Sequence, residues 1–276
     1  MIKADKHFLD NINRIITEGV YDENPRPKYK DGTLSYSKYI THVFETYDLS
    51  NGEFPLTTLR NTAIKMGINE IFWIYQDQDS SLETAHKRGI VWWNDWNIGD
   101  NTIGKRYGAT VKKYDLMNKL LNGLEIDPFS RRHIINLLQE ADLQETKGLY
   151  PCAFETEWGV RKVNNIMYLD MILVQRSSDF LTANFINKIQ YVALQMMVAS
   201  HLGYSIGKFS HYVNNLHIYD RHEPAMFEIL ERTPLNQQPK IELLNNKNFY
   251  DFTIDDFKIS NIEGIQKIKS PLELAI

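Results

Sequence analysis

The chain has 276 residues, a formal net charge of −4 at pH 7 and a single cysteine. This length suits one large domain over residues 1–276, because no Pro-, Gly- or Ser-rich linker divides the chain. The slight acidity argues against general nucleic-acid binding, and one cysteine excludes an internal disulfide framework. No signal-peptide pattern begins the chain and no apolar stretch is long enough to span a bilayer, so a cytoplasmic protein is expected.

The first half of the chain predicts two helices. Apolar residues at helical spacing predict a helix over residues 6–18, which Gly19 ends. An irregular basic loop over 24–32 follows. A second helix is expected over 62–76, and it carries Glu70 among apolar neighbours instead of among other charges.

The second half predicts both strands and helices. A continuous apolar run predicts a buried strand over 165–175, and the strongest helical pattern covers 184–202. The remaining expected elements are strands over 204–212 and 216–219, a helix over 223–231 and a strand over 251–259. Because the strands do not alternate strictly with helices, the fold class expected is α+β.

Cys152 is the first candidate for chemistry. A strand that ends in Arg176, Ser177 and Asp179 follows it closely. The thiolate is the reactive form of cysteine, and a nearby guanidinium favours it, so this combination indicates an activated nucleophile beside an anion site. Taken alone, however, a lone cysteine is more often a small buried apolar residue.

Other polar residues fit the same kind of ligand. The Asn187 amide presents a donor and an acceptor, which is what reading the edge of a pyrimidine requires. His217 and Tyr219, two apart on a strand, face the same side, and Arg131 and Arg132 form a doubled cation. Each has an ordinary structural alternative: a core histidine, a helix-start residue or a solvated pair of charges. Together they indicate a receptor for a nucleoside monophosphate.

These residues belong to a longer series of motifs. In chain order the series is Arg26 with Asp31-Gly32-Thr33-Leu34, Phe54-Pro55-Leu56-Thr57-Thr58, Glu70-Ile71-Phe72-Trp73, Trp93-Asn94-Asp95-Trp96, Ile103-Gly104-Lys105-Arg106-Tyr107-Gly108, Ser130-Arg131-Arg132, Pro151-Cys152, Gln175-Arg176-Ser177-Ser178-Asp179, Asn187, His217-Ile218-Tyr219 and Leu274-Ala275-Ile276. In this order the series resembles the thymidylate synthase family over nearly the whole chain.

The resemblance implies a thymidylate synthase-like fold, with a mixed twisted sheet flanked by helices and with sheets packed back to back in a homodimer. It also implies a site for dUMP. Its members would be Arg26, Arg176 and Ser177 at the phosphate, with Arg131 and Arg132 from the other subunit, His217 and Tyr219 at the sugar, and Asn187 at the base. Gln175 would also belong to the dUMP-binding set.

The implied reaction is reductive methylation of dUMP to dTMP by 5,10-methylenetetrahydrofolate, a one-carbon methyltransferase activity. Cys152 would add to C6 of the base, while Glu70 and Tyr107 would assist proton transfers. Asp179 would bind the pterin, and the folate side would be formed with Trp93, Trp96, Ala183 and Ile276. No metal is implied, since the histidines and the single cysteine lack ligand spacing.

Departures from the family pattern leave alternatives open. Ala183 replaces a glycine near the pterin, Asn214-Asn215 replaces Gly-Asp before His217, and Leu59-Arg60 replaces Thr-Lys. A dUMP hydroxymethylase, which adds water instead of hydride, is the second hypothesis, and a non-catalytic nucleotide- or RNA-binding homologue is the third. Asn187 favours uracil over cytosine, and the Leu-Ala-Ile end favours hydride transfer. The divergence suggests a viral source, in which case the host cytoplasm is expected.

Overall fold

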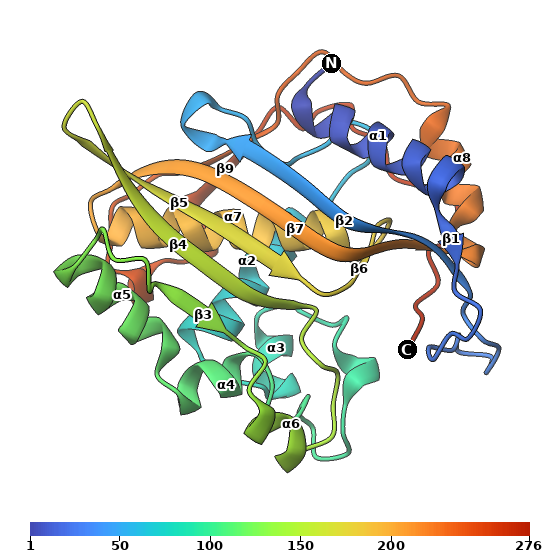
Figure 1. Ribbon diagram of the computed structural model, residues 1–276, viewed down its shortest axis with the longest axis horizontal. Helices are drawn as coiled ribbons and strands as arrows, with labels where there is room; N and C mark the ends of the chain where they lie inside the picture. The colour runs from blue at the N-terminus through green and yellow to red at the C-terminus, as the bar shows by residue number, and fades with distance from the viewer.

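The computed structural model describes residues 1–276, and its centre is a twisted mixed sheet of seven strands (Figure 1). The strand order is β1-β2-β7-β5-β4-β3, with β6 beside β7, and β5 and β6 run parallel to β7 while the other neighbours are antiparallel. The strands are β1 Val20–Tyr21, β2 Ser37–Asp48, β3 Ile134–Asn136, β4 Ala153–Val163, β5 Ile166–Gln175, β6 Ser178–Asp179 and β7 Ser205–Tyr219. Strands β8 (Lys240–Leu243) and β9 (Phe257–Ser260) form a separate pair.

Helices cover one face of this sheet. They are α1 Lys3–Glu18, α2 Ile64–Ile71, α3 Leu82–Lys87, α4 Gly108–Lys113, α5 Leu116–Ile126, α6 Glu140–Glu145, α7 Ala183–His201 and α8 Glu223–Leu230. Helix α7 lies against the middle of the sheet, and α2 packs beside it (Figure 1). Most side chains of α7 are buried because sheet and helices enclose it on several sides, which explains its largely apolar sequence.

Buried and exposed side chains alternate along the strands, so the two faces of the sheet differ in burial. In β7, for example, Phe209, His211 and Val213 are buried beneath the helices, whereas Ser210 and Tyr212 between them are partly exposed. The opposite face is not covered by any helix. It contains a hollow of roughly 480 Å³ lined by residues that include Arg131, Trp158 and Lys208.

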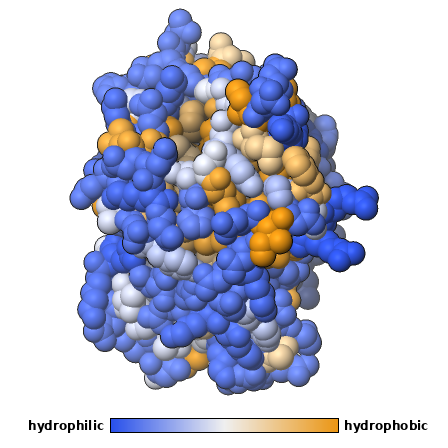
Figure 2. All heavy atoms as spheres, turned by 90° about the vertical axis from the view of Figure 1, so that its left-hand side faces the viewer, coloured by the Kyte–Doolittle hydropathy of each residue, from blue (hydrophilic) through white to orange (hydrophobic).

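The face of the molecule drawn in Figure 2 is mainly hydrophilic. Seen from the left-hand side of Figure 1, hydrophobic groups lie in separate patches between hydrophilic ones (Figure 2). None of the helices combines the length and apolar character that crossing a membrane requires.

The predicted α+β class is confirmed, and most predicted elements are present. The first predicted helix is α1, the second is α2 with a π-helical turn over Phe72–Gln76, and the predicted strand and long helix are β5 and α7. Helix α8 also matches its prediction to within one residue at its end.

Two strand predictions were wrong. The strands expected over 204–212 and 216–219 are one strand, β7, because Val213 and Asn215 continue the ladder to Val43 and Thr41 of β2. The strand expected over 251–259 is only β9. Before it the chain makes two 3₁₀ turns, the second fixed by the Asp256 side chain, which accepts from the N–H of Thr253.

Candidate active site

Cys152 lies directly before β4, where β4 pairs with the end of β5. Its carbonyl accepts the Arg176 N–H at 3.0 Å, and its own N–H donates to the Tyr107 hydroxyl at 3.2 Å. Tyr107 has φ 47°, in the left-handed region that bulky residues rarely adopt. The next residue must be glycine, because a Cβ at Gly108 would meet the backbone oxygen of Asp79 at 2.2 Å.

Arg176 is the cation nearest to the thiol. Its Nη2 lies 3.4 Å from Cys152 Sγ and donates to the Tyr150 carbonyl at 2.7 Å, while its Nε donates to the Pro151 carbonyl at 3.1 Å. Burial raises the pKa of the Cys152 thiol, and the guanidinium groups of Arg176 and Arg26 act in the opposite direction. The protonated thiol therefore predominates near neutral pH, and the thiolate forms as its proton is removed.

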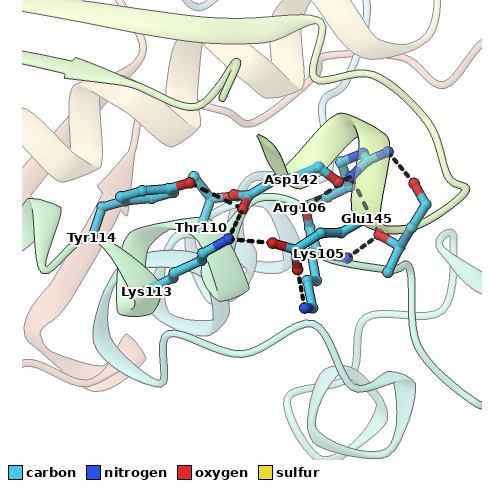
Figure 3. Close-up of polar contacts among 8 residues, drawn as sticks. Lys105, Arg106, Thr110, Lys113, Tyr114, Asp142 and Glu145 are labelled. Atoms are coloured by element: carbon cyan, nitrogen blue, oxygen red, sulfur yellow. Dashed lines mark hydrogen bonds and ion pairs between the residues drawn. The ribbon is translucent and has the colours of Figure 1, made fainter. Parts of the chain in front are cut away.

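A buried polar cluster anchors the segment that leads to Cys152 (Figure 3). Asp142 of α6 is 1% exposed and accepts from Thr110 at 2.7 Å and from Lys113 at 2.7 Å. Arg106 donates to the Asp142 carbonyl at 2.6 Å and to the Thr146 carbonyl at 2.7 Å. The cluster thus joins α4, α6 and the start of the loop that ends at Cys152.

Glu70 of α2 lies in a mainly apolar pocket. Burial raises the pKa of its carboxyl to about 7, although nearby tryptophan and glutamine N–H groups favour the charged form. Trp92 Nε1 donates to it. Trp93 Nε1 and Gln190 Nε2 are buried donors without a hydrogen-bond partner in this chain, and both lie close enough to favour the carboxylate. A carboxyl poised near neutral pH can both give and take a proton.

Asn187, near the start of α7, joins a row of hydrogen bonds. Its Oδ1 accepts from Gln175 Nε2 at 3.1 Å, and its Nδ2 donates to Gln190 Oε1 at 2.8 Å. Gln175, at the end of β5, accepts from His211 Nε2 of β7 through its Oε1. The amide is therefore held from two sides, and one donor and one lone pair remain for a ligand.

His217 and Tyr219 lie side by side at the end of β7. Their ring centroids are 4.9 Å apart, and Asn215 Oδ1 lies 3.0 Å from His217 Nδ1. Burial lowers the pKa of His217, so its ring is neutral near pH 7. Asn215, which stands where the family pattern has aspartate, thus supplies the acceptor that orients the ring and leaves Nε2 free.

Asp179 connects the site with the end of the chain. Its Oδ1 accepts the N–H groups of Leu181 at 3.1 Å and Thr182 at 3.3 Å, just before Ala183 begins α7. Burial alone would raise the pKa of this carboxyl, but His222, 3.7 Å away, together with His217 and Thr182, outweighs burial and the pKa is lowered. The His222 Nε2 in turn lies 2.8 Å from the Glu273 carbonyl.

The C-terminal segment returns to the basic loop that contains Arg26. Ile276 and Lys28 exchange two backbone hydrogen bonds, of 2.8 and 2.9 Å. Arg221 links the same two segments, since it donates to both Asp31 and Glu273. Arg26 itself is exposed and near enough to Cys152 to influence its pKa.

Two tryptophans lie on the other side of the site. Trp93 is 7% exposed, and its ring packs edge-on against Tyr107 and Trp96, with centroids 5.2 and 5.4 Å apart. The Trp93 ring therefore packs against Tyr107 and supports it. Trp96 is more exposed than Trp93.

The chain does not bring all predicted residues together. Ser177 lies partly exposed beside Arg176 and forms no hydrogen bond within the chain. Arg131 and Arg132 are exposed before β3, and Arg131 lines the hollow on the open face of the sheet. They are thus separate from the residues grouped around Cys152.

Comparison with known proteins identifies the family. Residues 6–274 match the family model described as thymidylate synthase. The chain is 51% identical over 280 residues to the thymidylate synthase of Streptococcus pneumoniae strain 70585, and 50% identical to that of Streptococcus gordonii, with all of each chain covered. The chain belongs to the thymidylate synthase family.

Structure comparison agrees with this assignment. Thermostable thymidylate synthase A from Bacillus subtilis superposes with a TM-score of 0.89 and 31% identity, and the match covers 99% of each chain. The thymidylate synthase-like fold, the function and the methyltransferase class that the motifs predict are therefore confirmed.

Four residues at this thymidylate synthase site escaped the sequence analysis. They are Trp92, Gln190, His211 and His222, which contact Glu70, Asn187, Gln175 and Asp179. Trp92 adjoins a motif tryptophan and Gln190 lies one helical turn after Asn187, so spacing could have found these two. Nothing in the sequence indicates the partners of His211 and His222.

Proposed function

We propose that this thymidylate synthase converts dUMP to dTMP with 5,10-methylenetetrahydrofolate through a covalent bond to Cys152. One observation carries the proposal: the only thiol lies 3.4 Å from the Arg176 guanidinium, beside the Tyr107 hydroxyl. An anionic phosphate beside Arg176 and Arg26 would bring a pyrimidine ring to that sulfur.

Each residue of the candidate site has its own step in the proposed reaction. Cys152 sulfur adds to C6 of the base, which makes C5 nucleophilic towards the methylene carbon that the folate supplies. Glu70 moves protons at the ring, and Tyr107 assists removal of the C5 proton. The bond between the methylene carbon and the folate nitrogen then breaks, and the tetrahydrofolate released gives a hydride that reduces the methylene to the methyl group. Breaking the carbon–sulfur bond to Cys152 releases dTMP, and the folate leaves as dihydrofolate. Ile276 and the surrounding tail exclude water, which would otherwise give the hydroxymethyl product.

We further propose a homodimer joined through the open face of the sheet. Phe44 on that face is 56% exposed, and Arg131 and Arg132 form no ion pair within the chain. A second copy packed back to back would cover the face, and Arg131 and Arg132 of the partner subunit would complete the phosphate site.

Product analysis tests the activity. The purified protein is incubated with dUMP and the folate, and the nucleotide product is identified by mass. We expect dTMP and an equal amount of dihydrofolate, whereas 5-hydroxymethyl-dUMP would overturn the proposal in favour of the hydroxymethylase.

A Cys152→Ser variant tests the nucleophile. Because a hydroxyl is a far weaker nucleophile than a thiolate, we expect turnover to fall by about 10³-fold or more while dUMP still binds. Arg176→Lys serves as a comparison that keeps the thiol and weakens its anion site. Full turnover by the serine variant would falsify the covalent mechanism.

A further inference from the structure

Four side chains form one continuous row of hydrogen bonds beneath the candidate base site. His211 Nε2 donates to Gln175 Oε1 at 2.5 Å, Gln175 Nε2 donates to Asn187 Oδ1 at 3.1 Å, and Asn187 Nδ2 donates to Gln190 Oε1 at 2.8 Å. Three of the four residues are at most 2% exposed. Water therefore cannot readily replace a lost partner in this row.

In every hydrogen bond of the row the donor lies on the His211 side and the acceptor on the Gln190 side. An amide can turn over and exchange its donor for its acceptor, but turning one amide here would set two donors or two acceptors face to face. The three amides must consequently turn together or not at all. At one end, Gln190 Nε2 lies close to Glu70, and a turned Gln190 would bring its oxygen towards that carboxyl group.

His211 closes the other end of the row. Burial lowers the pKa of its ring to about 3, and Lys188 acts in the same direction, so the ring is neutral and carries one N–H. Lys188 is fixed by Glu45 at 2.9 Å, and both side chains are 2% exposed. Gln175 can keep its present orientation only while His211 Nε2 carries that proton.

The donor-to-acceptor direction of the row decides which pyrimidine base the Asn187 amide can bind. Uracil offers an acceptor at O4 and a donor at N3, whereas cytosine offers a donor at N4 and an acceptor at N3. An amide free to turn could bind either edge. An amide held in one orientation matches one edge and leaves unpaired groups against the other.

We propose that His211, acting through Gln175, is a positioning residue that locks the Asn187 amide in the orientation that reads uracil and rejects cytosine. This inference rests on the proposed function, because it takes Asn187 as the residue that contacts the base. It adds a residue that would not touch the nucleotide and that nonetheless determines specificity.

A His211→Leu variant tests the lock. The dissociation constants of dUMP and dCMP, and kcat/KM with dUMP, are measured for the wild type and the variant. We expect dUMP affinity to fall by about tenfold or more while dCMP affinity stays or rises, so the ratio of the two falls by at least about tenfold. Equal losses for both nucleotides would mean that His211 only supports packing, and would overturn the inference.

Matched variants separate the lock from general damage. His201→Leu removes a different histidine, the partly buried last residue of α7, whose Nδ1 accepts the Phe249 N–H. His201 lies 14 helical residues after Asn187, which separates the two by about 21 Å. We expect its nucleotide ratio to equal that of the wild type. His211→Gln, which restores a donor, should return the ratio to within about threefold.

A Gln175→Glu variant applies the same test if His211→Leu does not fold. A carboxylate cannot donate to Asn187 Oδ1, so the ratio should fall as it does without His211, and an unchanged ratio would overturn the inference. The proposed function fails separately: in that case the wild type would form no dTMP. Formation of dTMP together with unchanged ratios in the variants would contradict only the lock.

Discussion

At the scale of single residues, Glu70 shows a conflict between stability and chemistry. Its pocket raises the pKa of the carboxyl to about 7 from a usual 4.5. The folded chain therefore binds this proton more tightly than the unfolded chain does. Stability from this group is fully present below about pH 4.5 and is lost as pH rises through about 7, a difference of ~3 kcal/mol.

A Glu70→Gln variant should lose activity and change this pH dependence. We expect kcat to fall by about 10²-fold or more, because glutamine cannot transfer a proton. Between pH 5 and pH 8, the variant should gain ~2–3 kcal/mol in free energy of unfolding relative to the wild type. Urea unfolding at both pH values measures the gain. A difference between the two proteins that does not change with pH would show that Glu70 titrates normally.

The sequence indicates the residues proposed to carry chemistry more readily than the residues that hold those side chains in place. Cys152, Arg176 and Asn187 have side chains whose chemistry points to a task by itself. His211 and His222 are informative only through their neighbours, which lie 36 and 51 residues away along the chain. Such contacts depend on register and topology, which residue spacing does not specify.

At the scale of elements, the long strand β2, Ser37–Asp48, is absent from the elements that the sequence pattern predicts, and its buried face shows why. Val43, Glu45 and Tyr47 all face the helices, so Glu45 interrupts an otherwise apolar inward row. The interruption is compensated by Lys188 of α7, together with bonds from Asn11 and Tyr47. A charged pair whose members lie 143 residues apart cannot be recognised from alternation alone.

The loop before Cys152 depends on α6, so Asp142→Ala should weaken both stability and turnover. It leaves Thr110 and Lys113 without their buried acceptor, which should cost about 3 kcal/mol in free energy of unfolding. We expect kcat to fall more than dUMP affinity, because Cys152 moves with the loop, whereas Arg176 follows the end of β5 and loses only the loop carbonyls that orient it. Chemical unfolding and steady-state kinetics measure the two effects. Asp142→Asn, which keeps an acceptor, should lose less; equal losses in both variants would contradict this role.

The C-terminal segment should control which product forms. Deleting Ile276 removes both of its backbone bonds to Lys28, while Glu273 keeps its contacts with Arg221 and His222. We expect folate KM to rise by about tenfold and part of the product to become 5-hydroxymethyl-dUMP, since water reaches the site. Mass analysis of the nucleotides measures the partition. Leu244, also exposed but distant in sequence from the tail, offers Leu244→Ala as a control. Pure dTMP at an unchanged rate would show that closure does not need this residue.

At the scale of the whole molecule, the uncovered face of the sheet is the largest feature that a single chain leaves unexplained. Its partly exposed strand residues and its hollow lie on the side opposite α7. The proposed phosphate site has only Arg176 and Arg26 as cations near Cys152 within one chain. The proposed homodimer accounts for both features with one symmetric contact.

Mixed dimers test this arrangement. Cys152→Ser subunits lack the nucleophile, and subunits with both Arg131→Ala and Arg132→Ala cannot complete the site of their partner, so each variant alone should be nearly inactive. After the two are unfolded and refolded together in equal amounts, half of the dimers are mixed, and each mixed dimer contains one intact site. The mixture should therefore recover about one quarter of wild-type activity. Sedimentation confirms that dimers have formed, and mixing without refolding is the control. If dimers form and no activity returns, the arginines do not act across the interface. If the wild type sediments as an active monomer, the active site is complete within one chain.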